Sequence, residues 1–157
     1  MDVRAKIPTN QGTWPAIWLL GKNVNEDGGF FDAQFGTTNW PACGEIDIME
    51  HLGRDLNKIY GTLHHPGHSG GNADGGNVTI SNASTEFHVY AVDWTSSYIK
   101  FYVDNQLYYS FVNTNSLPFN QNFFLIFNCA MGGNFGGNID PNFTSTTLEV
   151  DYVRVYQ

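Results

Sequence analysis

The stretch Gly44-Glu45-Ile46-Asp47-Ile48-Met49-Glu50 reads as a buried β-strand that carries three carboxylates within six positions. Side chains alternate between the two faces of a strand, so Glu45 and Asp47 share one face and a regular strand would turn Glu50 to the other. One extra residue at position 48 or 49, a β-bulge, returns Glu50 to the face of the other two. The spacing therefore predicts a bulged strand that presents Glu45, Asp47 and Glu50 in a row.

A row of carboxyl groups suits the hydrolysis of a glycosidic bond. The retaining form of that reaction uses one carboxylate as nucleophile and one carboxylic acid as proton donor, about 5–5.5 Å apart. Like charges at close range raise at least one pKa, which keeps a general acid protonated near neutral pH, and the group titrates as a coupled set. The alternative is the solvated face of an amphipathic antiparallel strand, where acidic and aliphatic residues alternate without catalytic purpose.

The rest of the chain predicts an all-β fold. Apolar or period-two runs occur at residues 3–7, 16–20, 45–51, 59–64, 87–94, 98–103, 106–111, 123–130 and 148–156, and no convincing helical window interrupts them. Asp104-Asn105 between two of these runs is typical of a two-residue hairpin turn. Residues 22–38 and 66–76 read as long loops. We expect a β-sandwich that forms one domain over residues 1–157.

Composition narrows the class of partner. The chain has only seven Lys and Arg residues and a net charge of -8, which argues against nucleic acid as a partner. No apolar run is long enough to span a membrane. Aromatic residues at 15% suit either a sugar-binding surface, because pyranose faces stack on aromatic rings, or a sandwich core. Cys43 and Cys129 are too few for a disulfide framework, so we expect buried free thiols.

Several segments together resemble glycoside hydrolase family 16, and its laminarinases (endo-β-1,3-glucanases) in particular. The resemblance extends along nearly the whole chain and rests on Gly12-Thr13-Trp14-Pro15-Ala16-Ile17-Trp18, Trp40-Pro41-Ala42-Cys43 leading into Gly44 to Glu50, Gly61-Thr62-Leu63-His64, Phe87 to Thr95, Met131-Gly132-Gly133-Asn134 and Val150 to Tyr156. It implies a concanavalin-like jelly roll of two curved antiparallel sheets with a cleft on the concave face. It also implies that Glu45 is the nucleophile, Asp47 its electrostatic helper and Glu50 the acid/base.

Five further residues are candidates for sugar contacts. Trp14 and Trp18 are four apart, hence on one face of a strand, where they form a stacking wall or fill the core. Trp40 is a candidate from a loop. The resemblance implies that His64 bonds near the cleavage site and that Asn134 reaches the sugar. His65 and His68 match no standard zinc spacing, and their Gly-rich loop argues against a preorganised metal site.

The resemblance also implies a structural calcium ion held partly by Asp151. The family has several strands before the segment that begins at Val3, so we expect the catalytic domain to be N-terminally incomplete, with unpaired sheet edges. Its other calcium ligands would then precede Met1.

Two classes of function remain open at this point. The first is a secreted, retaining endo-hydrolase for the internal β-1,3 bonds of laminarin-like glucans, which needs no cofactor for its chemistry. The second is a non-catalytic β-glucan-binding module on the same fold. The intact Glu45 and Glu50 favour the enzyme. Within the enzyme class, an agarase or carrageenase is the alternative, although sulfated substrates call for cationic residues that this chain has in small number.

Overall fold

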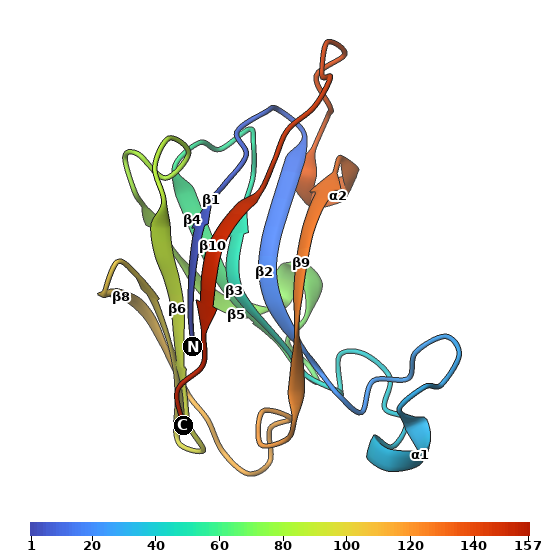
Figure 1. The fold of residues 1–157 in the computed structure, drawn as a ribbon. Coiled ribbons are helices and arrows are strands. Elements are labelled where there is room, and N and C mark those ends of the chain that lie inside the picture. Colours follow the sequence, from blue (N-terminus) through green and yellow to red (C-terminus); the bar gives the residue numbers. More distant parts are fainter.

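Two five-stranded antiparallel sheets pack face to face in the computed structural model, which describes residues 1–157 (Figure 1). The first sheet has the order β10 (Glu149–Arg154), β1 (Asp2–Lys6), β6 (His88–Trp94), β7 (Tyr98–Val103) and β8 (Gln106–Val112). The second has the order β5 (Asp74–Thr79), β4 (Lys58–His64), β3 (Glu45–His51), β2 (Thr13–Gly21) and β9 (Phe123–Met131). The expected β-sandwich is confirmed.

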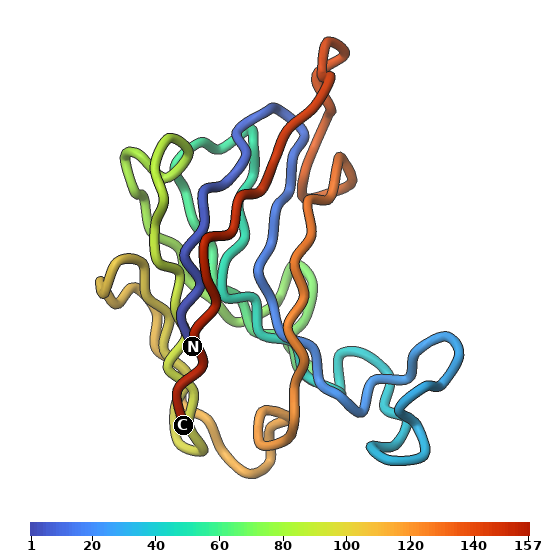
Figure 2. Tube along the Cα trace, viewed as in Figure 1, coloured from blue at the N-terminus to red at the C-terminus, as the bar shows by residue number.

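Period-two sequences build both sheets, because alternate side chains enter the space between them. In β7, Ile99, Phe101 and Val103 are buried, whereas the residues between them face outward. Residues from both sheets form one buried cluster of 17 side chains. Chain ends lie close together in Figure 2, where β1 runs beside β10 with Asp2 opposite Arg154.

The nine expected strands are all present, and those at Glu45–His51 and Tyr98–Val103 have the predicted bounds. Asp104 and Asn105 adopt positive φ angles of 48° and 67°, which confirms the hairpin turn between β7 and β8. The prediction that residues 66–76 are only loop was wrong, because β5 begins at Asp74. Its glycines gave no strand signal in the sequence. A Cβ atom at Gly76 would lie 2.9 Å from Tyr109, so close packing excludes the β-branched and aromatic residues that are typical of strands.

Helices are minor elements of the fold. They are α1 (Asp32–Phe35), α2 (Gly133–Gly136) and a 3₁₀ turn at Gly70–Asn72. None of them has the length and apolar character needed to cross a membrane.

A bulge in β3 decides which face its carboxylates occupy. Asp47 pairs with Thr62 and Glu50 with Tyr60, so residues 48 and 49 of β3 together lie opposite Gly61 of β4. Ile48 and Met49 both enter the core, at 1% and 0% exposure. The predicted bulge is confirmed, and it brings Glu50 back to the face of Glu45 and Asp47.

Gly61 leaves no room for a side chain opposite the bulge. A Cβ atom there would lie 2.4 Å from the Tyr108 hydroxyl oxygen and 2.8 Å from Cδ1 of Phe101. We expect Gly61→Ala to lower the free energy of unfolding by about 1–3 kcal/mol, the usual cost of overpacking a core. Urea denaturation measures this, with Gly71→Ala as the matched control because nothing lies within 4 Å of a Cβ there. Equal losses in the two variants would contradict the prediction.

Candidate active site

The three carboxylates of β3 lie on the face of the second sheet that points away from the first. Ile46, Ile48 and Met49 belong to the core, so Glu45, Asp47 and Glu50 occupy the opposite side of the strand. Asp47 and Glu50 are nonetheless only 3% and 7% exposed. Side chains of β2, β4 and the loop before β3 surround the row and limit its contact with water.

Glu50 is held by hydrogen bonds from both neighbouring strands. The indole Nε1 of Trp14 in β2 donates to Oε1 at 2.9 Å, and the Thr62 hydroxyl in β4 donates to Oε2 at 2.9 Å. Each carboxylate oxygen therefore has one donor, which fixes the position of the group. Trp14 thus serves the carboxylate row and does not merely fill the core.

Glu45 receives its partners from a loop and from the end of β4. Trp40 donates its indole N–H to Oε2 at 2.9 Å, and Nε2 of His64 lies 3.5 Å from Oε1. The same His64 nitrogen lies 3.2 Å from Oδ2 of Asp47. The backbone N–H of Gly70 donates to Nδ1 of His64 at 3.2 Å, so the neutral ring carries its proton on Nε2, which faces the two carboxylates.

Burial and mutual repulsion shift the titration of the row. Burial, with a further contribution from Asp47, raises the pKa of Glu45 from 4.5 to about 7, against the lowering effects of His64 and Trp40. Burial, together with the charge of Glu50, raises the pKa of Asp47 well above its ordinary value. Oδ2 of Asp47 is buried without a hydrogen bond, which a protonated carboxyl tolerates better than a charged one. The pKa values of Glu45 and Asp47 are therefore both raised, which agrees with the prediction that at least one pKa in the row is raised.

The remaining sugar candidates divide into two groups. Trp18 lies opposite Asp47 in the β2–β3 pairing, but its indole donates to Oδ1 of Asn128 in β9 at 2.7 Å and not to a carboxylate. Asn134 is exposed in α2, and its contact with the sugar stays a prediction. Its neighbour Phe135 instead packs edge-on against Trp14, with ring centroids 5.3 Å apart.

Sequence reasoning missed Thr62, Asn128 and Phe135. Thr62 alternates with buried residues in β4 beside His64, so the strand pattern could have indicated it. Asn128 and Phe135 come from an edge strand and a Gly-rich turn, where no local pattern marks a contact with a distant tryptophan.

Asp151, the expected calcium ligand, lies on the exposed strand β10. Its Oδ2 atom pairs with Arg4 at 2.7 Å. The groups of three or more side chains that could hold a metal ion are Glu45, Asp47 and His64, and separately His65, His68 and Asp74. Asp151 belongs to neither group, and a single carboxylate beside an arginine does not form a calcium site by itself. Calcium binding at Asp151 stays a prediction.

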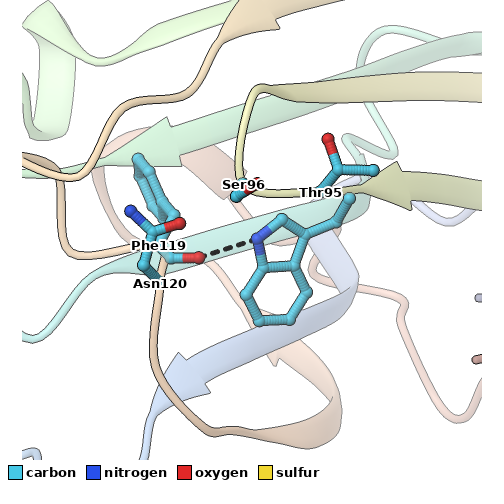
Figure 3. Close-up of a pocket in the computed structure, with 5 residues that line it drawn as sticks. Thr95, Ser96, Phe119 and Asn120 are labelled. Atoms are coloured by element: carbon cyan, nitrogen blue, oxygen red, sulfur yellow. Dashed lines mark hydrogen bonds between the residues drawn. The ribbon is translucent and has the colours of Figure 1, made fainter.

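Two features lie away from the carboxylate row. Cys43 and Cys129 are both free, as expected, but Cys129 is exposed because it lies on the edge strand β9, so the prediction of two buried thiols was wrong for it. A shallow hollow lies beside Trp94, Thr95, Ser96, Phe119 and Asn120 (Figure 3). There the Trp94 indole donates to the Phe119 carbonyl at 2.8 Å, and the Trp94 side chain packs against the core cluster.

Comparison with known proteins places this geometry in a family. The chain is 41% identical to a beta-glucanase of Rhodothermus marinus, over 99% of this chain and 56% of that protein. It is 39% identical to glucan endo-1,3-beta-glucosidase A1 of Niallia circulans, over 100% of this chain and 24% of that protein. A structure of LamA from Zobellia galactanivorans in complex with laminaritriose and laminaritetraose has a TM-score of 0.91 and 45% identity, and covers 99% of this chain and 64% of its own.

This chain therefore spans about half or less of the curated relatives' length and about two thirds of the solved one. Its two curved antiparallel sheets agree with the expected jelly roll. Residues 1–154 match the description of glycosyl hydrolases family 16, and the chain belongs to that family.

Proposed function

We propose that the chain hydrolyses internal β-1,3 bonds of laminarin-like glucans with retention of anomeric configuration. One observation carries the proposal: Glu45 and Glu50 lie on one face on either side of Asp47, and each is oriented by a tryptophan N–H. A solvated strand face would not bury two of its three acids or direct indole donors at them. The arrangement costs folding free energy, which catalysis explains and a structural role does not.

The mechanism needs one ionised and one protonated carboxyl group on the same face. In our proposal Glu45 attacks the anomeric carbon as the carboxylate and forms a glycosyl ester, while Glu50 protonates the leaving glycosidic oxygen. Glu50, now ionised, then takes a proton from water as that water displaces Glu45 from the sugar. Asp47 lies between them, and its raised pKa allows it to retain a proton and donate a hydrogen bond to either neighbour.

A neutral glucan fits this site better than a sulfated one. No Lys or Arg forms an ion pair with Glu45, Asp47 or Glu50, and the chain carries a net charge of -8. Sulfate groups would meet acidic surroundings without the cationic partners that bind them. The similar proteins named beta-glucanase and glucan endo-1,3-beta-glucosidase A1 further support a β-glucan. Because a polysaccharide does not cross membranes, we propose that the protein works outside the cell.

Release of reducing sugar from laminarin tests the proposed activity. We expect wild-type protein to release oligosaccharides whose first-formed reducing ends are β anomers by proton NMR, which is the signature of retention. Glu45→Gln and Glu50→Gln should each lower kcat/KM by about 1,000-fold or more, because each removes an essential group and keeps its shape. Glu86→Gln, which replaces an exposed glutamate far along the sequence from the row, is the matched control and should remain active.

Other outcomes would redirect the proposal. Laminarin binding without bond cleavage by folded wild-type protein would indicate the glucan-binding module, and cleavage of agarose or carrageenan in place of laminarin would indicate the alternative substrates. Unchanged activity in both glutamine variants would refute the assignment of the site.

Trp40→Phe tests the role of Glu45 through the pH profile. The hydrogen bond from Trp40 lowers the pKa of Glu45, so its loss should raise that pKa further above about 7. A nucleophile must be ionised, so we expect the acidic limb of the kcat/KM profile to move to higher pH in this variant. A shift of the alkaline limb would instead show that Glu45 is the proton donor.

Glu45→Gln should also change the pH dependence of stability. Because the pKa of Glu45 is raised in the folded state from 4.5 to about 7, its favourable contribution is complete below pH 4.5 and is lost as the pH rises through 7. The neutral variant avoids this loss and should exceed the wild type at pH 8 by on the order of 1–3 kcal/mol, with no gain at pH 4. Urea unfolding at both pH values measures the difference. A parallel pH dependence in wild type and variant would contradict it.

A further inference from the structure

A second cluster of metal-ligating side chains lies beyond the end of β4. Nε2 of His65 lies 2.9 Å from Oδ2 of Asp74, and Nδ1 of His68 lies 3.1 Å from the same oxygen. The two imidazole rings stack on each other, with centroids 4.8 Å apart and planes inclined by 16°. Two nitrogens therefore converge on one carboxylate oxygen, and all three ligand atoms lie within 4.8 Å of one another.

A tight turn preorganises the two histidines, contrary to the expectation from the Gly-rich sequence. His65 and His68 exchange both backbone hydrogen bonds, at 2.9 Å each, around Pro66 and Gly67. Gly67 has a φ of 83°, a conformation that glycine adopts freely. Directly paired residues in such a turn project their side chains to the same side, and Asp74, the first residue of β5, completes the group.

The burial of these groups matches a partly open metal site. His65 is 5% exposed and packs against the rings of Phe111 and Phe119, which fixes its orientation. The His68 side chain is 49% exposed, so an ion can reach the cluster from solvent. Ligand atoms around a tetrahedral zinc ion lie about 3.3–3.5 Å apart, given bonds of about 2.0–2.2 Å. The distances from Oδ2 of Asp74 to the His65 and His68 nitrogens, 2.9 and 3.1 Å, need to lengthen by only a few tenths of an ångström to fit such an ion.

We propose that His65, His68 and Asp74 bind a divalent transition-metal ion of the zinc class. Two imidazole nitrogens and one carboxylate oxygen are borderline donors that suit zinc and leave a coordination position for water. Calcium and magnesium prefer sites made of oxygen atoms, so they should bind here weakly. The negative net charge of the chain favours any cation that approaches.

The site is separate from the carboxylate row but shares a loop with it. Gly70, which donates its N–H to His64, lies between His68 and Asp74 in the sequence. An ion that ties His68 to Asp74 would therefore restrain the segment that orients His64. The metal site does not depend on the proposed hydrolysis, because neither its ligands nor its test requires activity.

Calorimetric titration of chelator-treated protein with zinc chloride tests the proposal. We expect one equivalent to bind in the wild type and to raise the Tm, because a ligand that binds the folded state stabilises it. His68→Ala and Asp74→Asn should each weaken binding at least tenfold, since each removes a direct ligand. His68 is half exposed, so its replacement leaves the core intact. Magnesium chloride at the same concentration should leave the Tm unchanged.

Three variants separate this site from other places where zinc could bind. Asp104→Asn removes the carboxylate of the His88–Asp104 contact, a pair of similar geometry at 2.6 Å that lacks a second histidine, and should leave binding unchanged. Glu45→Gln and Cys129→Ser should also leave zinc binding unchanged, because neither residue belongs to the cluster of His65, His68 and Asp74. The proposal fails if no saturable binding occurs, if zinc binding survives in both His68→Ala and Asp74→Asn, or if Glu45→Gln abolishes it.

Discussion

The one-residue bulge in β3 is the constraint on which the site depends. It lets Ile48 and Met49 both enter the core while Glu45, Asp47 and Glu50 share the outer face. Without it, Glu50 would point into an apolar interior, where an isolated charge is very unfavourable. Gly61 is the counterpart in β4, because a larger residue there would collide with Phe101 and Tyr108. The bulge and Gly61 therefore determine both the packing of the core and the face on which the acids lie.

Three acids in a row destabilise the fold, and their neighbours compensate only in part. Trp14, Trp40 and Thr62 donate hydrogen bonds to the two glutamates, whereas Asp47 lies buried between them without one. Burial, with a further contribution from the charge of Asp47, raises the pKa of Glu45 to about 7, and a proton on this carboxyl group lowers the repulsion within the row. The raised pKa weakens the fold at alkaline pH, whereas the proposed hydrolysis requires Glu45 to be ionised when it attacks the sugar. In that proposal, the site gives up some stability for function.

Features with a local signal could be predicted from the sequence, and features that depend on distant packing could not. The bounds of β3 and β7, the bulge and the Asp104-Asn105 turn follow from alternation and turn chemistry, which act over a few residues. β5 was missed because Gly76 packs against the side chain of Tyr109 in the other sheet and Gly75 against the backbone of β4, contacts that no local sequence pattern shows. Phe135 has no pattern that connects it to Trp14, since the contact exists only after β2 and β9 have paired.

The alternation of side chains explains how consecutive histidines come to serve different surroundings. His64 faces the outer side of the sheet, where its Nε2 meets Asp47 and Glu45, and His65 therefore turns to the opposite side, against Phe111 and Phe119. The sheet separates the two imidazoles, so their ligand atoms cannot combine into one His-His-x-x-His site. The turn at Pro66 and Gly67 instead returns His68 to the side of His65, and β5 brings Asp74 to both. Spacing alone groups the three histidines, whereas strand geometry assigns one to the carboxylates and two to a separate cluster.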